Sequence, residues 1–135
     1  MSIPIDRLNP PTLHEPPGYH HVNIVEGRRW AFLAGQCPLD RSGKVVGPSL
    51  DVQVRQVAQN ASAALSAAGA QPEDVVRSVI YVVSDISGSL ADVWRLFQAS
   101  PIGPAFTTAS TLLGVAALGY PGQLVELDLT AALPD

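Results

Sequence analysis

An alternation of polar and apolar residues near the C-terminus places the strongest constraint on how this chain folds. In the segment LVELDLT, Glu126 and Asp128 fall on one side of an extended chain, while Val125, Leu127 and Leu129 fall on the other. This two-residue repeat is typical of a strand with one face against a core. Burying an unpaired carboxylate is costly in free energy. The side that carries the two acids is therefore either solvated or part of a polar pocket formed against another subunit.

Periodicity elsewhere predicts a series of strands interrupted by two helices. The expected strands are residues 20–25, 29–33, 75–84, 107–115 and 123–130, and the expected helices are residues 50–68 and 90–99. Strands that pair as neighbours and then return through a helix give an α+β fold with the helices on one face of the sheet. The other face of the sheet then needs a partner.

Local signals refine three of these elements. The turn residues 26–28 predict a hairpin between the first two strands. Ser89, with Asp92 in the reciprocal position, predicts the N-terminal cap of the second helix. Residues 75–84 are β-branched on both sides, which predicts an interior strand covered on both faces.

The composition favours a single domain that associates with itself. Of the 135 residues, 47% are hydrophobic and only 15% are charged, so a monomer would leave apolar surface in water. We expect one domain over residues 17–135, preceded by a proline-rich, extended N-terminal arm over residues 1–16.

Charge and hydropathy argue against several kinds of partner. The net charge is -4 and the basic residues form no stripe, which disfavours nucleic acid. The single cysteine, Cys37, excludes an internal disulfide and fits a reducing compartment. The N-terminus lacks the basic start and apolar region of a signal peptide, and no apolar run is long enough to span a bilayer. We therefore expect a cytoplasmic protein with no membrane partner.

The histidines do not suggest a metal site. His20 and His21 are adjacent on a predicted strand, so their side chains point to opposite faces, and His14 lies in the arm. The chain also lacks a glycine-rich phosphate loop. We expect neither a metal nor a cofactor.

Five short motifs, in a fixed order, resemble the YjgF/RidA family of reactive-intermediate deaminases. They are P-G-Y at residues 17–19, A-G-Q-x-P-L-D at 34–40, N-x-x-A-x-L-x-A-A-G at 60–69, P-A-x-[ST]-T at 104–108 and L-V-E-L-D at 124–128. The resemblance extends over nearly the whole chain. It implies a chorismate-mutase-like α+β fold, a mixed sheet with two helices on one face, and a homotrimer that packs its sheets inward. It also implies sites for a small molecule in the clefts between subunits.

The resemblance assigns roles to several residues of such a cleft. Glu126, the first carboxylate of L-V-E-L-D, would position the water that attacks a C=N carbon, as a carboxylate in a cleft can. Tyr19 would line the cleft, and Ala34 and Gly35 would bring backbone groups close to the ligand, with alanine where the family commonly has serine. Solvated or structural roles remain open for Glu126 and Tyr19, and Asp128 reads as structural.

The main departure from the family pattern is Phe106. Deaminating members carry an arginine at this position of P-A-x-[ST]-T, where it grips a substrate carboxylate through two charge-assisted hydrogen bonds. Phenylalanine cannot do so, and the cleft therefore should not hold a 2-imino acid in the family's manner. An arginine such as Arg28, Arg29 or Arg95 reaching in beside Glu126 would restore anion binding.

Two further candidate ligand-binding positions also differ from many members. Trp94 stands where many have an asparagine, and Thr108 where some have a cysteine. Trp94 belongs either to the apolar stripe of its helix or to an aromatic pocket with Tyr19 and Phe106.

Two functions from different classes follow. The first is a RidA-like enzyme that hydrolyses C=N bonds of imines or enamines but lacks the usual 2-imino acid deaminase activity. The second is a trimer that binds a small molecule or a partner without catalysis. An endoribonuclease activity, a label also given to family members, fits the acidic charge less well.

Overall fold

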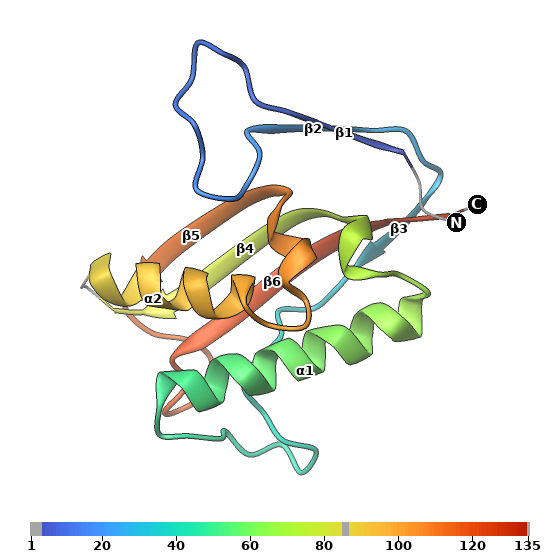
Figure 1. Cartoon of the computed structure of the whole chain (residues 1–135). Coiled ribbons are helices and arrows are strands. Elements are labelled where there is room, and N and C mark those ends of the chain that lie inside the picture. The colour runs from blue at the N-terminus through green and yellow to red at the C-terminus, as the bar shows by residue number, and fades with distance from the viewer. Residues whose placement is uncertain (1–3, 85–86, 135) are drawn as a thin grey trace.

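The computed structural model describes residues 4–84 and 87–134. Figure 1 shows the arrangement of the helices and strands, and the two short segments η1 and η2 are 3-10 turns. The elements in chain order are β1 (Ile5–Leu8), β2 (Val22–Val25), β3 (Arg29–Phe32), α1 (Leu50–Ala68), η1 (Pro72–Asp74), β4 (Val75–Val83), α2 (Ser87–Gln98), η2 (Gly103–Phe106), β5 (Ala109–Val115) and β6 (Val125–Leu133).

The main sheet has four strands in the order β3-β6-β4-β5. β6 runs antiparallel to both of its neighbours, and β4 runs parallel to β5. Both helices cover the same face of this sheet (Figure 1). The expected α+β fold, with a mixed sheet and two helices on one face, is confirmed.

The alternation in β6 determines which residues build the core. Val125, Leu127 and Leu129 are fully buried beneath the helices, whereas Glu126 and Asp128 on the opposite face are only half-buried. Successive side chains of a strand point to opposite faces of the sheet, so buried and half-buried residues alternate along β6.

Helix α1 occupies the predicted residues and packs through its apolar stripe. Val57, Ala61 and Leu65 on this stripe are buried in the core. Gly69 ends the helix with a φ of 79°, a left-handed conformation that favours glycine because it has no Cβ.

The predicted hairpin between residues 20–25 and 29–33 is wrong. β2 pairs with β1, a strand within the N-terminal arm, and the two form a separate two-stranded sheet. β3 instead pairs with the end of β6, with Arg29 opposite Leu133. The connecting residues 26–28 lack the Asn-Gly or Asp-Gly pair that closes a tight hairpin, so the pairing is decided by tertiary contacts.

Two other local predictions also differ from the structure. α2 begins at Ser87, so Ser89 lies inside the helix and does not cap it. β4 is covered on one face only, because Ser78, Ile80 and Val82 are buried while Tyr81 and its same-face neighbours are half-buried. The β-branched residues of β4 reflect strand propensity on both faces, whereas the single chain supplies helices for only one.

The uncovered side of the main sheet carries large apolar side chains, and we call it the open face. Phe32 is 79% exposed, and Trp30 and Leu113 are each 41% exposed. The strand register places the following residues on the open face: Trp30, Phe32, Val79, Tyr81, Leu113, Glu126 and Asp128.

A buried glutamine ties α1 to the turn that precedes β6. The Nε2 of Gln53 donates to the carbonyl oxygen of Gly122 at 2.9 Å, and its Oε1 accepts from the backbone N–H of Leu124 at 2.8 Å. Gln53 is 1% exposed, so water cannot replace these bonds.

Replacing Gln53 with leucine should destabilise the protein. The Gln53→Leu variant leaves two backbone groups of the turn without partners, which should lower the free energy of unfolding by about 2 kcal/mol. Urea denaturation measures this loss. Gln59→Leu, the same change on the exposed side of α1, is the matched control and should stay within about 0.5 kcal/mol of the parent. Equal stability of the two variants would show that Gln53 does not hold the turn.

Candidate functional site

Glu126 lies in the middle of β6, with its side chain on the open face. Its neighbour across the strand pair is Tyr81 of β4, and Tyr81 in turn lies opposite Leu113 of β5. The sequence prediction that Glu126 leaves the core is confirmed, and the structure adds the groups that surround its carboxylate.

Two side chains donate hydrogen bonds to the same oxygen of this carboxylate. The Sγ of Cys37 lies 3.3 Å from Oε1 of Glu126, and the Nε2 of Gln123 lies 3.1 Å from it. Glu126 forms no ion pair with any residue in ranges 4–84 and 87–134. The charge is therefore held by neutral donors, which stabilise a carboxylate without cancelling it.

The segment that carries Cys37 is fixed alongside β6 by backbone hydrogen bonds. Gln36 and Leu127 exchange two such bonds, with N–O distances of 2.7 and 3.0 Å. The pair brings Gly35 directly against Glu126. A Cβ built on Gly35 would overlap Oε2 of Glu126 and lie 2.9 Å from its Cδ. Only glycine leaves this carboxylate in place.

The contact with Glu126 changes the chemistry of the thiol. Burial, the hydrogen bond that it donates to Glu126 and the negative charge of Glu126 together raise the pKa of Cys37 from 9.0 to about 11. Cys37 is therefore a neutral S–H donor at neutral pH rather than a nucleophilic thiolate.

A row of aromatic rings lies at the opposite edge of the sheet. The ring centroids of Tyr19 and Trp94 are 6.2 Å apart, those of Trp94 and Phe106 are 6.0 Å apart, and those of Phe106 and Phe97 are 5.1 Å apart. The indole Nε1 of Trp94 donates to the carbonyl oxygen of Pro17 at 3.0 Å. The predicted grouping of Tyr19, Trp94 and Phe106 thus exists within a single subunit.

A cavity of ≈ 450 Å³ opens beside the exposed end of this aromatic row. It lies at β5, the edge strand of the main sheet, against the first half of α2. Its lining is mainly apolar, with three hydroxyl-bearing residues, and comprises Pro17, Tyr19, Leu90, Ala91, Trp94, Ser110, Thr111 and Leu112. We call it the aromatic pocket.

Phe106 and Thr108 both lie behind the aromatic pocket rather than on its surface. Phe106 is 1% exposed and packs between Trp94 and Phe97. Thr108 is fully buried, and its hydroxyl accepts a hydrogen bond from the side-chain amide of Asn23. In the single subunit, Phe106 therefore supports Trp94 from the core and stands on the other side of the sheet from Glu126.

The two parts of the candidate site do not meet within one chain. Glu126 is two strands away from β5, a separation of about 10 Å across the sheet. It is also absent from the lining of the aromatic pocket. The chain thus carries a carboxylate part (Gly35, Cys37, Gln123 and Glu126) and a separate aromatic part.

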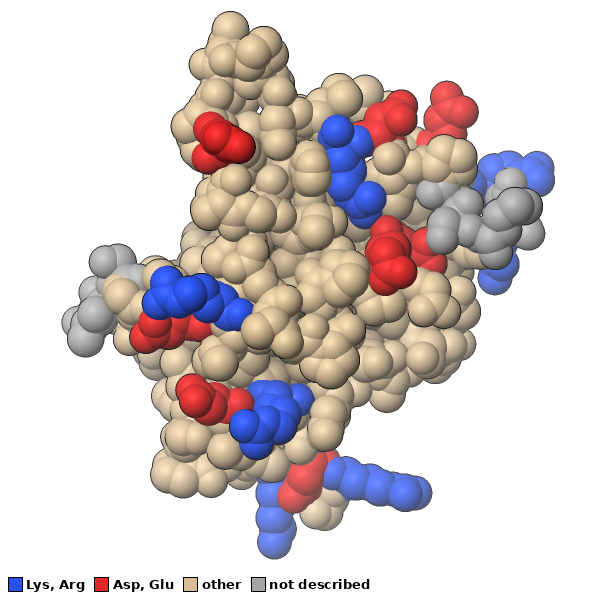
Figure 2. All heavy atoms as spheres, viewed as in Figure 1, with Lys and Arg blue, Asp and Glu red and all other residues tan. Residues whose placement is uncertain are grey.

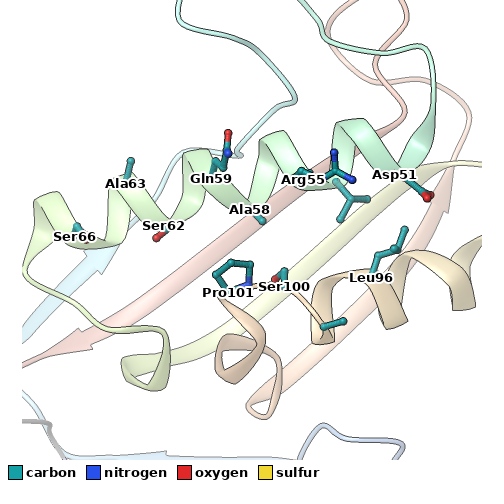
Figure 3. A pocket seen from close by; sticks show the side chains of 12 residues that line it. Asp51, Arg55, Ala58, Gln59, Ser62, Ala63, Ser66, Leu96, Ser100 and Pro101 are labelled. Atoms are coloured by element: carbon teal, nitrogen blue, oxygen red, sulfur yellow. The ribbon is translucent and has the colours of Figure 1, made fainter.

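A larger cavity of ≈ 730 Å³ lies far from this chemistry, between α1 and α2 (Figure 3). Figure 3 shows the short side chains of Ala58 and Ser62 on the side of α1 that faces Ser100 and Pro101, just beyond the end of α2. The groove exists because these side chains are too small to fill the space between the helices. It contains neither Glu126 nor the aromatic row.

Charged side chains are dispersed over the surface. Figure 2 shows Lys and Arg in small separate groups, mostly beside Asp or Glu, on the face in view. Arg95 pairs with Asp92, and Arg29 donates to the carbonyl oxygen of Pro134. Neither arginine is bonded to Glu126. Among the described residues, no group of three or more His, Cys, Asp or Glu side chains is arranged to hold a metal ion. No helix in the described ranges has the length and apolar character to cross a membrane.

Sequence reasoning does not identify Gln123 or the role of Cys37. Both contact Glu126 through side-chain conformations that the pattern of polar and apolar residues does not predict. One signal was available for Cys37, since A-G-Q-C-P places it two residues after the glycine that touches Glu126. Gln123 has no comparable signal, because it precedes the strand in a turn.

Known proteins are similar to this chain in sequence and in fold. The family model described as Endoribonuclease L-PSP matches residues 12–133. A RutC family protein, PH0854 from Pyrococcus horikoshii, is 36% identical over 63 residues, which are 46% of this chain and half the length of that relative.

Solved structures agree with this match. The Rid family protein YyfB from Yersinia pestis, described as of unknown function, is 32% identical with a TM-score of 0.81, and the alignment covers 96% of this chain and 98% of that one. Rv2704 from Mycobacterium tuberculosis, a member of the YjgF/YER057c/UK114 family, has a TM-score of 0.63 at 23% identity, with coverage of 96% and 100%. The chain belongs to the YjgF/Rid family, whose family model is described as Endoribonuclease L-PSP.

Proposed function

We propose that this protein hydrolyses small neutral imines or enamines in clefts between the subunits of a homotrimer. The observation that carries the proposal is the Glu126 carboxylate, held on the open face against Gly35 by two neutral donors. The aromatic pocket of the same chain cannot reach it, so a complete site needs the carboxylate part of one subunit and the aromatic part of another.

The open face supports self-association. Phe32, Trp30 and Leu113 leave a broad apolar surface on the side of the sheet without helices. Soluble monomers rarely expose such a patch, because apolar surface in water is unfavourable. Packing three open faces together would bury these residues and would bring the edge of one sheet to the face of another.

The chemistry required of Glu126 is proton transfer. The carboxylate accepts a proton from water as the water oxygen bonds to the C=N carbon, and it passes this proton to the substrate nitrogen to give a carbinolamine. Glu126 then takes the proton of the carbinolamine hydroxyl and passes it to the nitrogen as the C–N bond breaks, so that ammonia or an amine leaves and a carbonyl product remains. No further reagent is needed.

The aromatic pocket supports a neutral substrate rather than a 2-imino acid. Tyr19 and Trp94 offer ring surface, and Ser110 and Thr111 add aliphatic hydroxyl groups to the lining. Position 106, where deaminating members have arginine, holds a phenylalanine buried in the core. A substrate carboxylate would therefore lack the bidentate partner that this position supplies elsewhere in the family.

The phenylalanine at position 106 also supports a second candidate function, which is binding of a small molecule without catalysis. A trimer that lacks the anion-binding arginine could retain a small molecule between Trp94 and Glu126 without turning it over. Thermal-shift measurements with neutral aromatic amines and aldehydes test this alternative, because a ligand that binds only the folded state raises the apparent stability.

Removing the charge of Glu126 should abolish hydrolysis. Ammonia release is measured with imines generated in situ from neutral amines and, in parallel, from amino acids. We expect the parent protein to act on the neutral imines, and Glu126→Gln to reduce that rate at least about 100-fold. Asp128→Asn, one strand repeat further along the same face, is the matched control and should retain most of the rate. Equal rates for Glu126→Gln and the parent would contradict the proposed role.

A charge on the open face should dissociate the trimer. Sedimentation equilibrium should give three chains of 14.2 kDa for the parent and a lower mass for Phe32→Glu, because the glutamate would be forced into an apolar interface. Val52→Glu, at an exposed apolar position on α1, is the control and should remain trimeric. A monomeric parent, or a trimeric Phe32→Glu, would show that the open face is not the interface.

A further inference from the structure

We propose that Gln123 and Cys37 are positioning residues that hold the Glu126 carboxylate by Oε1 and leave Oε2 to meet the ligand or water. This inference rests on the proposed role of Glu126. It goes further in naming which oxygen acts and which side chains orient it.

Gln123 is a fixed donor. Its side chain is 3% exposed and its amide is fully engaged. The Nε2 donates both to Glu126 Oε1 and to the carbonyl oxygen of Val125, each at 3.1 Å, and the Oε1 of Gln123 accepts from the backbone N–H of Tyr120 at 3.1 Å. An amide bonded on both sides cannot rotate without breaking buried hydrogen bonds.

The turn that carries Gln123 is itself held from α1. Gln53 bonds the backbone of Gly122 and Leu124, the residues on either side of Gln123. The position of the Gln123 amide is therefore set by the helix layer, on the far side of the sheet from the open face.

Cys37 approaches the same oxygen from another segment of chain. The side-chain amide of Asn60 in α1 donates to the carbonyl oxygens of Cys37 and Leu39 at 3.0 and 2.9 Å, which fixes the backbone around the thiol. The S–H can then donate to Glu126 Oε1 at 3.3 Å. α1 thus anchors both donors, Gln123 through Gln53 and Cys37 through Asn60.

The two oxygens of the carboxylate consequently differ. Oε1 has two donors, one from each flank, whereas Oε2 lies against the backbone of Gly35 and has no hydrogen-bond partner among the described residues. A carboxylate oxygen has lone pairs that seek donors. Oε2 is therefore the atom left to accept the proton of an attacking water.

Alkylation of Cys37 tests the contact without any catalytic activity, because the chain has no other cysteine. The probe is iodoacetamide, which reacts with the thiolate, and the rate is followed from pH 7 to 11 by mass spectrometry. Burial, the largest cause of the raised pKa, persists in Glu126→Gln, but the negative neighbour is lost, so the pKa of Cys37 should fall below about 11 and the rate at pH 9 should rise several-fold. Asp128→Asn should leave the profile unchanged. An unchanged profile in Glu126→Gln would overturn the assignment of Cys37.

The kinetics of imine hydrolysis test whether the two donors affect the reaction through Glu126. Cys37→Ala removes the donor and should lower kcat about tenfold with little change in KM, since the oriented carboxylate acts in the transition state. Cys37→Ser keeps a donor and should recover most of that loss. Gln123→Leu should act like Cys37→Ala, and circular dichroism with urea unfolding shows whether it folds. Equal losses in Cys37→Ala and Cys37→Ser would indicate packing alone and would overturn the positioning role.

The two proposals fail separately. If the parent hydrolyses no imine, the proposed function fails while the alkylation profile still decides the contact between Cys37 and Glu126. If Glu126→Gln leaves the alkylation profile of Cys37 unchanged but abolishes hydrolysis, the positioning role of Cys37 is wrong and the proposed function still holds.

Discussion

The rest of the structure depends on burial of one face of the main sheet beneath two helices. The inward side chains of β6 and β4 fill the space under α1 and α2, and this apolar contact is what a single chain contributes to its own stability. No helix in residues 4–84 or 87–134 covers the open face, where Phe32 and Trp30 remain accessible. The same division leaves Glu126 outside the core, where a charged carboxylate can exist without the full cost of burial.

Long periodic elements could be predicted from the sequence, and short ones could not. α1 and β6 follow their predicted positions because many residues agree on one periodicity and Gly69 marks an end. The pairing of β2 with β1 could not be predicted, since each strand has only four residues and its partner is chosen by contacts distant in sequence. The prediction of the first residue of α2 was wrong for a similar local reason. Ser87, Gly88 and Ser89 all have residue types that can cap a helix, so the sequence indicates no single start.

Only the backbone-determined part of the candidate site could be predicted. Glu126 and Gly35 occupy positions fixed by strand register and by a close approach of two segments, and motif resemblance transfers such positions well. The orientation of Phe106 could not be transferred, because it depends on Phe97 and Trp94 in α2, and an aromatic side chain gains more from burial among other rings than from exposure. The phenylalanine at position 106 therefore belongs to the core rather than to the surface of the aromatic pocket.

The two-residue repeat of β6 has a consequence for how this protein can change. Odd-numbered positions from 125 to 129 are committed to the core, so substitutions there alter stability first. Even-numbered positions from 124 to 130 face away from the helices, so substitutions there alter the open face before they alter the core. A library that randomises residues 124, 128 and 130 and keeps Glu126 would therefore vary the surroundings of the carboxylate without changing the buried positions of the strand.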